Sequence, residues 1–159
     1  MPSPNVDGSD AAEAAFEFEY RWQEASVPPP HHYHYRILGS TAGRGRIEFV
    51  PGYDHPGTPT WVEPFEADAP ACAALSDLLQ REQVLHRAWR QGLPPGGVGG
   101  SQYGLRLRQG ERQLELPANL GGADAALADT LARTITALVP EAVWAGLRQR
   151  HEAYVAARG

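Results

Sequence analysis

The stretch FEFEYRWQ, residues 16–23, decides the fold class of this chain. Phe16, Phe18, Tyr20 and Trp22 alternate in it with charged or polar residues. Strict alternation is typical of a β-strand with one buried face and one solvated face. The stretch therefore predicts a sheet whose apolar side is covered and whose charged side is open.

Two further stretches with the same alternation follow closely. Residues 32–37 alternate His and Arg with Tyr and Ile, and residues 46–49 place Ile47 and Phe49 opposite Arg46 and Glu48. The sequence GSTAGRG, residues 39–45, predicts a turn between them. Three strands so close in the sequence predict an antiparallel meander.

The rest of the chain predicts one more edge strand and a hairpin. Residues 61–65 form a short edge strand in this interpretation, because Pro64 cannot donate a hydrogen bond to a ladder. Residues 103–107 and 114–116 alternate again on either side of a turn at Gly110, which is typical of a hairpin.

Three helices are predicted by apolar residues at helical spacing. The first begins at Asp68, a good N-cap residue, and covers about residues 69–90, with a break near residues 81–83 as the alternative. The second is capped by Asp124, and the third begins at Pro140, which suits a first helical turn. We therefore expect an α+β fold: an antiparallel sheet of about five strands, a meander plus a hairpin, with helices packed on one face.

Length and composition set the broad class. The chain has 159 residues and a net charge of −5, which predicts a single α+β domain over residues 13–159 after a flexible tail at residues 1–12. The charge disfavours nucleic acid as a partner. No apolar run approaches the ~20 residues of a membrane helix, and the first residues lack the pattern of a signal peptide, so no membrane partner and a cytoplasmic location are expected.

The side of the sheet away from the helices is predicted to be polar and uncovered. The alternation places twelve residues there: Glu17, Glu19, Arg21, His32, His34, Arg36, Arg46, Glu48, Arg106, Arg108, Gln113 and Glu115. Arg and Glu are interleaved among them, so cross-strand ion pairs are expected to neutralise much of the surface. His32, His34 and Arg36 are the candidate binding residues of this face.

His32 and His34 also raise a metal hypothesis. On a strand they point to the same side, close enough to share a zinc or similar ion. Asp54 or His55 in the following loop supplies a third ligand in this hypothesis. A solvated strand face that carries two histidines is the alternative.

Residues 51–61 form a loop rich in Pro and Gly that contains two candidate contact residues, Tyr53 and Trp61. Exposed aromatic residues on a loop are typical of a partner contact. Alternatively, both rings fold down and cover the edge of the sheet.

No motif of a named enzyme chemistry is found. The Gly-rich residues 96–100 lack the Lys and the following helix of a phosphate loop. The lone Cys72 lies among Ala and Leu, as a buried apolar residue would. We expect a non-enzymatic binding or accessory domain that contacts another protein or a second copy. A metal-binding protein or small metal-dependent enzyme centred on His32 and His34 is the alternative.

The order of elements resembles that of the emfourin-like domains. The matching stretches are FEADAPACAALSDLLQ, residues 65–80, then a Gly-rich gap, then YGLRLRQGERQLELP, residues 103–117, and a helix. The similarity covers about two thirds of the chain and leaves out the first strand and the last helix. It implies a small protein that binds another protein, with inhibition of a metallopeptidase as one possibility, and it assigns no inhibitory residue.

Overall fold

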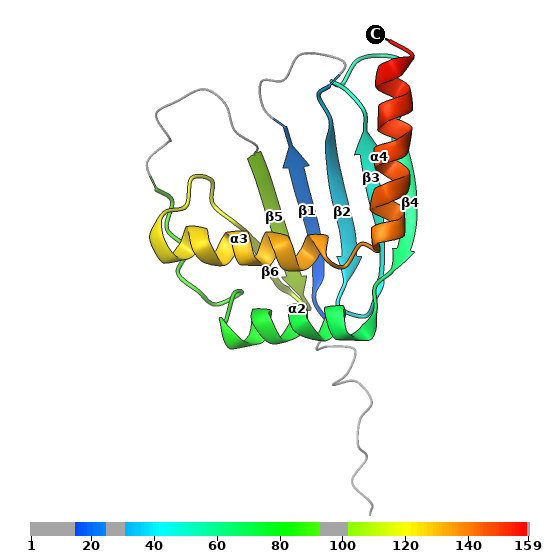
Figure 1. Cartoon of the computed structure of the whole chain (residues 1–159). Coiled ribbons are helices and arrows are strands. Elements are labelled where there is room, and N and C mark those ends of the chain that lie inside the picture. Colours follow the sequence, from blue (N-terminus) through cyan, green and yellow to red (C-terminus); the bar gives the residue numbers. More distant parts are fainter. Residues whose placement is uncertain (1–14, 25–30, 93–101, 159) are drawn as a thin grey trace, which may run out of the picture.

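The computed structural model of the chain describes residues 15–24, 31–92 and 102–158. Six strands form one antiparallel sheet in the order β4-β3-β2-β1-β5-β6, accompanied by three helices (Figure 1). The strands are β1 Glu17–Gln23, β2 His34–Ser40, β3 Arg44–Val50, β4 Trp61–Glu66, β5 Gln102–Gln109 and β6 Arg112–Glu115. The helices are α2 Ala69–Arg81, α3 Gly122–Thr136 and α4 Glu141–Ala156.

The α+β class and the antiparallel sheet predicted from the alternation are confirmed, with six strands where about five were expected. The stretch with Pro64 forms the complete edge strand β4, which pairs with β3 over its whole length. The predicted tail at residues 1–12 and the Gly-rich residues 96–100 lie outside the described residues.

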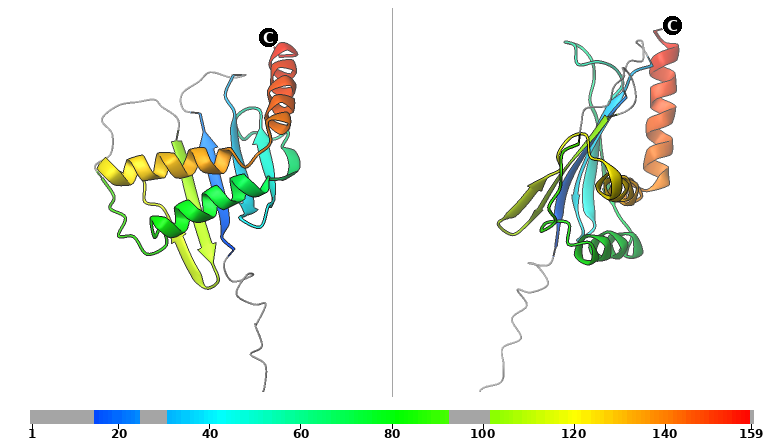
Figure 2. Two further views of the ribbon diagram at one scale, coloured as in Figure 1. Left: turned by 60° about the horizontal axis from the view of Figure 1, so that its bottom comes forward. Right: turned by 90° about the vertical axis from the view of Figure 1, so that its left-hand side faces the viewer.

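The three helices lie on the same side of the sheet (Figure 2). In Figure 1, α2 and α3 run across the strands, whereas α4 stands along β3 and β4. Trp144 of α4 meets Tyr35 edge-on at 5.2 Å between ring centroids, and Tyr154 meets Trp61 at 5.9 Å. The opposite side of the described strands carries no described helix, and we call it the open face.

The core lies between the sheet and the helices. Ile37 and Ile47 are opposite each other on β2 and β3, and both are fully buried. Leu75 of α2 and Leu131 of α3 close the core from the other side and are also fully buried. The removal of this apolar area from water, worth about 25 cal/mol per Å², is the main force that holds the layers together.

Helix α2 ends at Arg81, which confirms the alternative of a break near residues 81–83 rather than a helix that continues to about residue 90. Gln83 takes a left-handed conformation with φ 48°, and the amide of Val84 then donates to the Leu79 carbonyl at 3.1 Å. This is a Schellman cap, and the burial of both Val84 and Leu79 supplies its apolar contact. The type of cap could not be predicted, because Gln, rather than Gly, occupies the left-handed position.

The expected cap of α3 by Asp124 is wrong. The N-cap is Gly121, and no side chain caps the helix. Asp124 lies inside the first turn and accepts hydrogen bonds from Arg87 Nε at 2.9 Å and from the Arg90 amide at 3.2 Å. These bonds lower the pKa of Asp124 and tie the segment after α2 to α3. The predicted N-cap Asp68 is confirmed, since it accepts from the Ala71 amide at 2.8 Å.

Among the helices of the described residues, none has both the length and the apolar character that a membrane crossing requires.

Candidate binding surface on the open face of the sheet

The strand register determines which side chains share the open face. Antiparallel partners point to the same side, so the chain of pairs from Val62 to Glu48, Arg36, Arg21 and Gly104 forms one row across five strands. The neighbouring rows follow from the same pairing. The open face thus comprises Glu17, Glu19, Arg21, Gln23, His34, Arg36, Leu38, Ser40, Arg44, Arg46, Glu48, Val50, Val62, Pro64, Glu66, Gln102, Gly104, Arg106, Arg108, Gln113 and Glu115.

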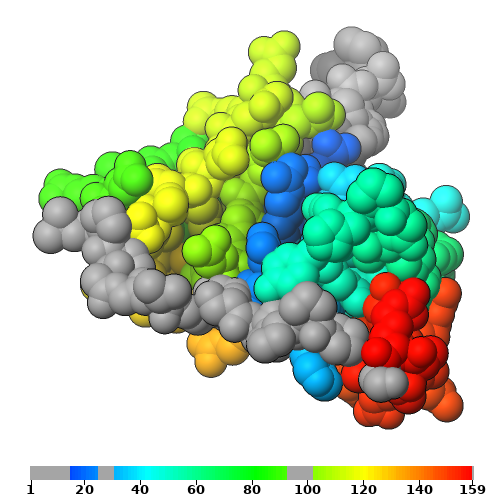
Figure 3. Space-filling model, turned by 90° about the horizontal axis from the view of Figure 1, so that it is seen from above, coloured from blue at the N-terminus to red at the C-terminus, as the bar shows by residue number. Residues whose placement is uncertain are grey.

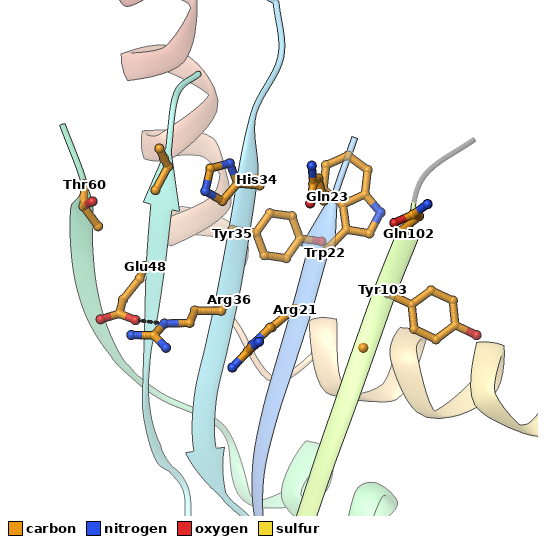
Figure 4. Close-up of a pocket in the computed structure, with 12 residues that line it drawn as sticks. Arg21, Trp22, Gln23, His34, Tyr35, Arg36, Glu48, Thr60, Gln102 and Tyr103 are labelled. Atoms are coloured by element: carbon orange, nitrogen blue, oxygen red, sulfur yellow. Dashed lines mark hydrogen bonds and ion pairs between the residues drawn. The ribbon is translucent and has the colours of Figure 1, made fainter. Parts of the chain in front are cut away.

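A depression of about 550 Å³ lies in this face, at the end of the sheet where β1 ends and β2 begins. Figure 4 shows Arg21, Arg36 and Glu48 side by side on neighbouring strands, with His34 nearer the strand ends. We call this the first depression. Its lining consists of Arg21, Trp22, Gln23, His34, Tyr35, Arg36, Glu48, Val50, Thr60, Gln102, Tyr103 and Gly104.

Gly104 gives the first depression much of its room. It lies directly opposite Arg21, and a Cβ atom at this position would meet nothing within 4 Å. Any larger residue would therefore project from the floor of the depression without a clash inside the protein. The glycine has ordinary strand geometry, so its missing side chain, rather than an unusual φ, matters here.

A second depression of about 430 Å³ follows the first along β1. It is lined by Glu17, Phe18, Glu19, Leu38, Gly39, Ser40, Arg106, Leu107, Arg108 and Gln113. In the view onto the strand ends in Figure 3, atoms of β1 are visible between the β5–β6 hairpin and residues 51–60. The two depressions thus follow one another along the central strand.

Glu19 is the centre of the ion pairs on this face. Its carboxylate lies 2.8 Å from Arg21 Nη2, 3.4 Å from Arg36 Nη1 and 3.9 Å from Arg106 Nη1. Burial raises the pKa of Glu19, but the Arg21 hydrogen bond and the three guanidinium charges outweigh it and lower that pKa below its ordinary value. Glu19 is therefore ionised at neutral pH.

Glu48 is the second centre of ion pairs on this face. It accepts from Arg36 Nε and lies 3.7 Å from Arg46 Nε. The hydrogen bond to Glu48 raises the pKa of Arg36 above its ordinary value. These pairs confirm the expectation that interleaved charges neutralise much of the face.

The two ends of these ion pairs are unequally accessible. The side chains of Glu19 and Glu48 are each 17% exposed, whereas Arg21 is 58% and Arg36 is 44% exposed. Arg106 is half exposed as well. The carboxylates are sunk between the strands, and the guanidinium groups form the accessible layer above them.

His32 does not lie on the open face as an exposed strand residue, contrary to expectation. It precedes β2 and is only 1% exposed, because its ring stacks on Tyr53 at 3.8 Å between centroids. Burial and the neighbouring His34 lower its pKa below the ordinary value, so the ring is neutral at neutral pH. Its Nδ1 atom is buried without a hydrogen-bond partner.

His34 is placed where the alternation predicted it, at the edge of the first depression. Its Nε2 atom lies 3.3 Å from a carboxylate oxygen of Asp54, and its ring centroid lies 5.8 Å from that of His32. Asp54 is 85% exposed, so water screens this contact. The pair attaches the loop after β3 to the rim of the depression.

The metal hypothesis finds no third ligand in the part of the chain that the structure describes. There, no three His, Cys, Asp or Glu residues lie together as a possible metal site. His55 is exposed, and its ring faces Tyr53 at 6.4 Å between centroids. A zinc site at His32, His34 and His55 stays a prediction, which metal analysis of untagged protein tests.

The two aromatic candidates of the 51–61 loop are separated. Trp61 points to the helix side of the sheet, where it stacks on Phe49 at 5.6 Å and lies under Arg150 of α4 at 4.4 Å. Its contribution is to cover the edge of the sheet, as one of the two alternatives predicted. Tyr53 remains near the open face through its stack on His32.

Cys72 lies on the far side of the core from this surface. It is buried in α2, and burial raises the pKa of its thiol above the ordinary value. A thiol held in its protonated form is a poor nucleophile at neutral pH. This environment agrees with the expectation of a small apolar core residue.

Eight lining residues were not among those predicted for this face: Trp22, Gln23, Tyr35, Val50, Thr60, Gln102, Tyr103 and Gly104. Gly104 occupies the polar phase of the alternation in β5, between Gln102 and Arg106. That position was a usable signal, since a glycine in a strand often marks the close approach of another group. Its location opposite Arg21 depends on the pairing of β1 with β5, which the alternation does not reveal.

Comparison with known proteins does not identify a family for this chain. No family model matches the chain, and no curated protein matches it. The resemblance to emfourin-like domains and the cytoplasmic location therefore stay predictions. The function has to be argued from the open face itself.

Proposed function

We propose that this protein is a non-enzymatic binding module that takes up a segment of another protein on the open face of its sheet. The first depression carries this proposal. Its volume of about 550 Å³ is within the roughly 300–1,000 Å³ of typical binding sites. A sheet face that contacts only solvent does not require a hollow of this size beside Gly104.

The lining combines the groups that a binding surface uses. Val50 supplies apolar area in the lining, and the exposed Val62 adds apolar area on the same face beside it. Gln23, Gln102 and Thr60 add amide and hydroxyl groups that can hydrogen-bond to a peptide backbone. Apolar area together with a few polar groups is the usual composition of a recognition site.

The charges of the face suit recognition better than proton transfer. A general acid or base works best with a pKa near the operating pH. The pKa of Glu19 is lowered instead, and that of Arg36 is raised, so both groups keep their charge through the neutral range. Fixed charges of this kind orient a ligand and select among ligands.

The shape of the hollow indicates an elongated ligand. The first depression borders residues 21–23 of β1, and the second borders residues 17–19. An extended peptide rises about 3.3 Å per residue, so a segment about as long as β1 spans both depressions. A polypeptide segment fits this hollow better than a compact small molecule does.

The test is a selection of short displayed peptides on the full chain, followed by binding measurements on three proteins. Gly104→Leu places a bulky side chain in the first depression, at a position where a Cβ atom meets nothing within 4 Å. Gly146→Leu is the matched control, since it introduces the same side chain into open space on α4. We expect selected peptides to bind the wild type and the control alike and the Gly104 variant at least about tenfold more weakly.

Backbone NMR spectra of the complexes locate the site independently. The amides of Arg21, His34 and Gly104 are expected to shift on addition of peptide. A selection that yields no peptides, or peptides that bind Gly104→Leu with full affinity, contradicts the proposal.

A further inference from the structure

The accessible charge of the open face differs from its formal charge. Six arginines and five glutamates lie on this face, so its formal charge is close to zero. The whole chain carries −5, and the acidic excess is therefore located elsewhere. At the centre of the face, however, the two carboxylates with most partners are the least exposed ones.

Four arginines share these two sunk carboxylates. Glu19 is contacted by Arg21, Arg36 and Arg106, and Glu48 by Arg36 and Arg46. Each guanidinium has five N–H donors in a planar fork, and the ion pairs occupy only some of them. Because Arg21, Arg36 and Arg106 are each about half exposed, the donors that these ion pairs leave over are accessible to a ligand and carry positive charge.

From this arrangement we infer that the segment bound on the open face is acidic, with its Asp or Glu carboxylates held by Arg36 and Arg21. The inference rests on the function proposed above and names the chemistry of the ligand. Guanidinium groups bind carboxylates through two parallel hydrogen bonds, which supplies direction as well as attraction.

The position of the arginines matches the hollow. Arg21 and Arg36 line the first depression, and Arg106 and Arg108 line the second. In the second depression Arg108 already pairs with the exposed Glu17 at 3.0 Å, so an acidic segment along β1 is held mainly by the guanidinium pair of the first depression. Gly104 leaves room in the first depression for the apolar parts of its side chains, and Leu38 supplies apolar area in the second.

The test uses a capped hexaglutamate peptide as the probe, titrated into the isotope-labelled full chain and followed by NMR. Two substitutions break the same ion pair from opposite sides, Arg36→Gln and Glu48→Gln. If the affinity for hexaglutamate depends only on the presence of the ion pair, both substitutions change the affinity in the same direction. If the affinity depends on the charge of the face, the two substitutions change it in opposite directions.

We expect saturable binding of hexaglutamate with shifts at Arg21, Arg36 and Gly104. Arg36→Gln is expected to weaken it about three- to tenfold, because a donor is lost and Glu48 becomes uncovered. Glu48→Gln is expected to strengthen it about two- to fivefold, because Arg36 is released from its partner. Glu66→Gln changes the net charge equally at a distant, exposed corner of the face, so it is expected to have almost no effect.

The possible failures separate the inference from the function on which it rests. The first failure combines two results: displayed peptides bind Gly104→Leu more weakly than the wild type, but hexaglutamate does not bind, or binds Glu48→Gln more weakly than the wild type. These results overturn the inference that the ligand is acidic and leave the proposed binding function intact. Hexaglutamate that binds Gly104→Leu as well as the wild type also overturns the inference, since the acidic segment then binds elsewhere. Displayed peptides that bind Gly104→Leu with full affinity overturn both the proposed function and the inference about the ligand.

Discussion

Glu19 is the residue that holds the largest number of charged partners on the open face. Its side chain is mostly buried between three guanidinium groups. Removal of such a carboxylate leaves Arg21, Arg36 and Arg106 to repel one another with no acceptor between them. The ion pairs therefore contribute to stability as a group, although each exposed partner alone contributes little.

Glu19→Gln is expected to lower the free energy of unfolding by about 1 kcal/mol at neutral pH. The pKa of Glu19 is lowered in the folded state, so the contribution is complete above its ordinary pKa of 4.5 and is lost as the pH falls through the folded-state value. Urea unfolding should show that the difference in the free energy of unfolding between the wild type and Glu19→Gln is smaller well below pH 4.5 than at neutral pH.

Glu115→Gln is the control for this prediction. Glu115 is 72% exposed, and its ion pair within the described part of the chain is with Arg106, so its removal is expected to change stability little at either pH. A Glu19 variant with wild-type stability at neutral pH would show that the three arginines find other partners.

His32 shows where residue-level prediction from the sequence stops. Alternation placed it beside His34, and the two rings are indeed close. Its burial could not be predicted, because the ring that covers it belongs to Tyr53 in a loop beyond the next strand. A pattern within one strand contains no information about a loop that folds back over its end.

At the scale of the elements, two glycines in the strands have opposite roles. Gly45 of β3 lies opposite Phe65, and a Cβ atom there would be 2.5 Å from the Phe65 ring and 2.7 Å from the Leu38 carbonyl oxygen. The ring occupies the space that the glycine leaves. Gly104 of β5, in contrast, has open space above it.

Gly45→Ala is therefore expected to destabilise the protein by about 1–3 kcal/mol, because the Phe65 ring or the strand must move. Gly104→Ala, the matched substitution in open space, is expected to be neutral or to stabilise by about 0.5 kcal/mol. Thermal or urea unfolding of both variants measures the difference. Equal effects would show that the Phe65 ring moves aside without cost.

Element types were predictable, and two of their ends were not. Each strand carries its own alternation, and each helix its own apolar spacing, so local sequence suffices for the type. The end of α2 depends on a left-handed Gln83, and the start of α3 on Gly121 in place of the expected Asp124. Gln83 in the left-handed position and Gly121 without a side-chain cap are not the residues that usually mark these ends, so the sequence indicated a break near residues 81–83 but did not determine either end.

At the scale of the whole molecule, the sequence predicted the two sides of the sheet but not the order of its strands. β5 pairs with β1, so the hairpin formed late in the chain is placed beside the first strand. This order aligns Gly104 with Arg21 and creates the first depression. The residues that point to the open face were thus predictable, whereas the shape of the site depends on long-range strand pairing, which no local pattern predicts.

The order also places β4 and α4 at the far side of the sheet from the β5–β6 hairpin (Figure 1). Helix α4 has one fully buried residue, Leu147, and otherwise contacts the sheet through partly buried aromatic rings and the Arg150–Glu63 ion pair at 3.3 Å. Whether this helix unfolds together with the sheet decides whether residues 13–159 are one domain.

Leu147→Ala is expected to lower the free energy of unfolding by about 2–4 kcal/mol, since it opens a cavity beneath α4. In a single cooperative domain, the far-ultraviolet dichroism of the helices and the fluorescence of the tryptophans shift to the same lower urea midpoint. Gln149→Ala, on the exposed side of the same helix, should leave both curves in place. Two separate transitions in the Leu147 variant, with the sheet unfolding at the wild-type midpoint, would make α4 an independent unit that docks on a self-sufficient sheet.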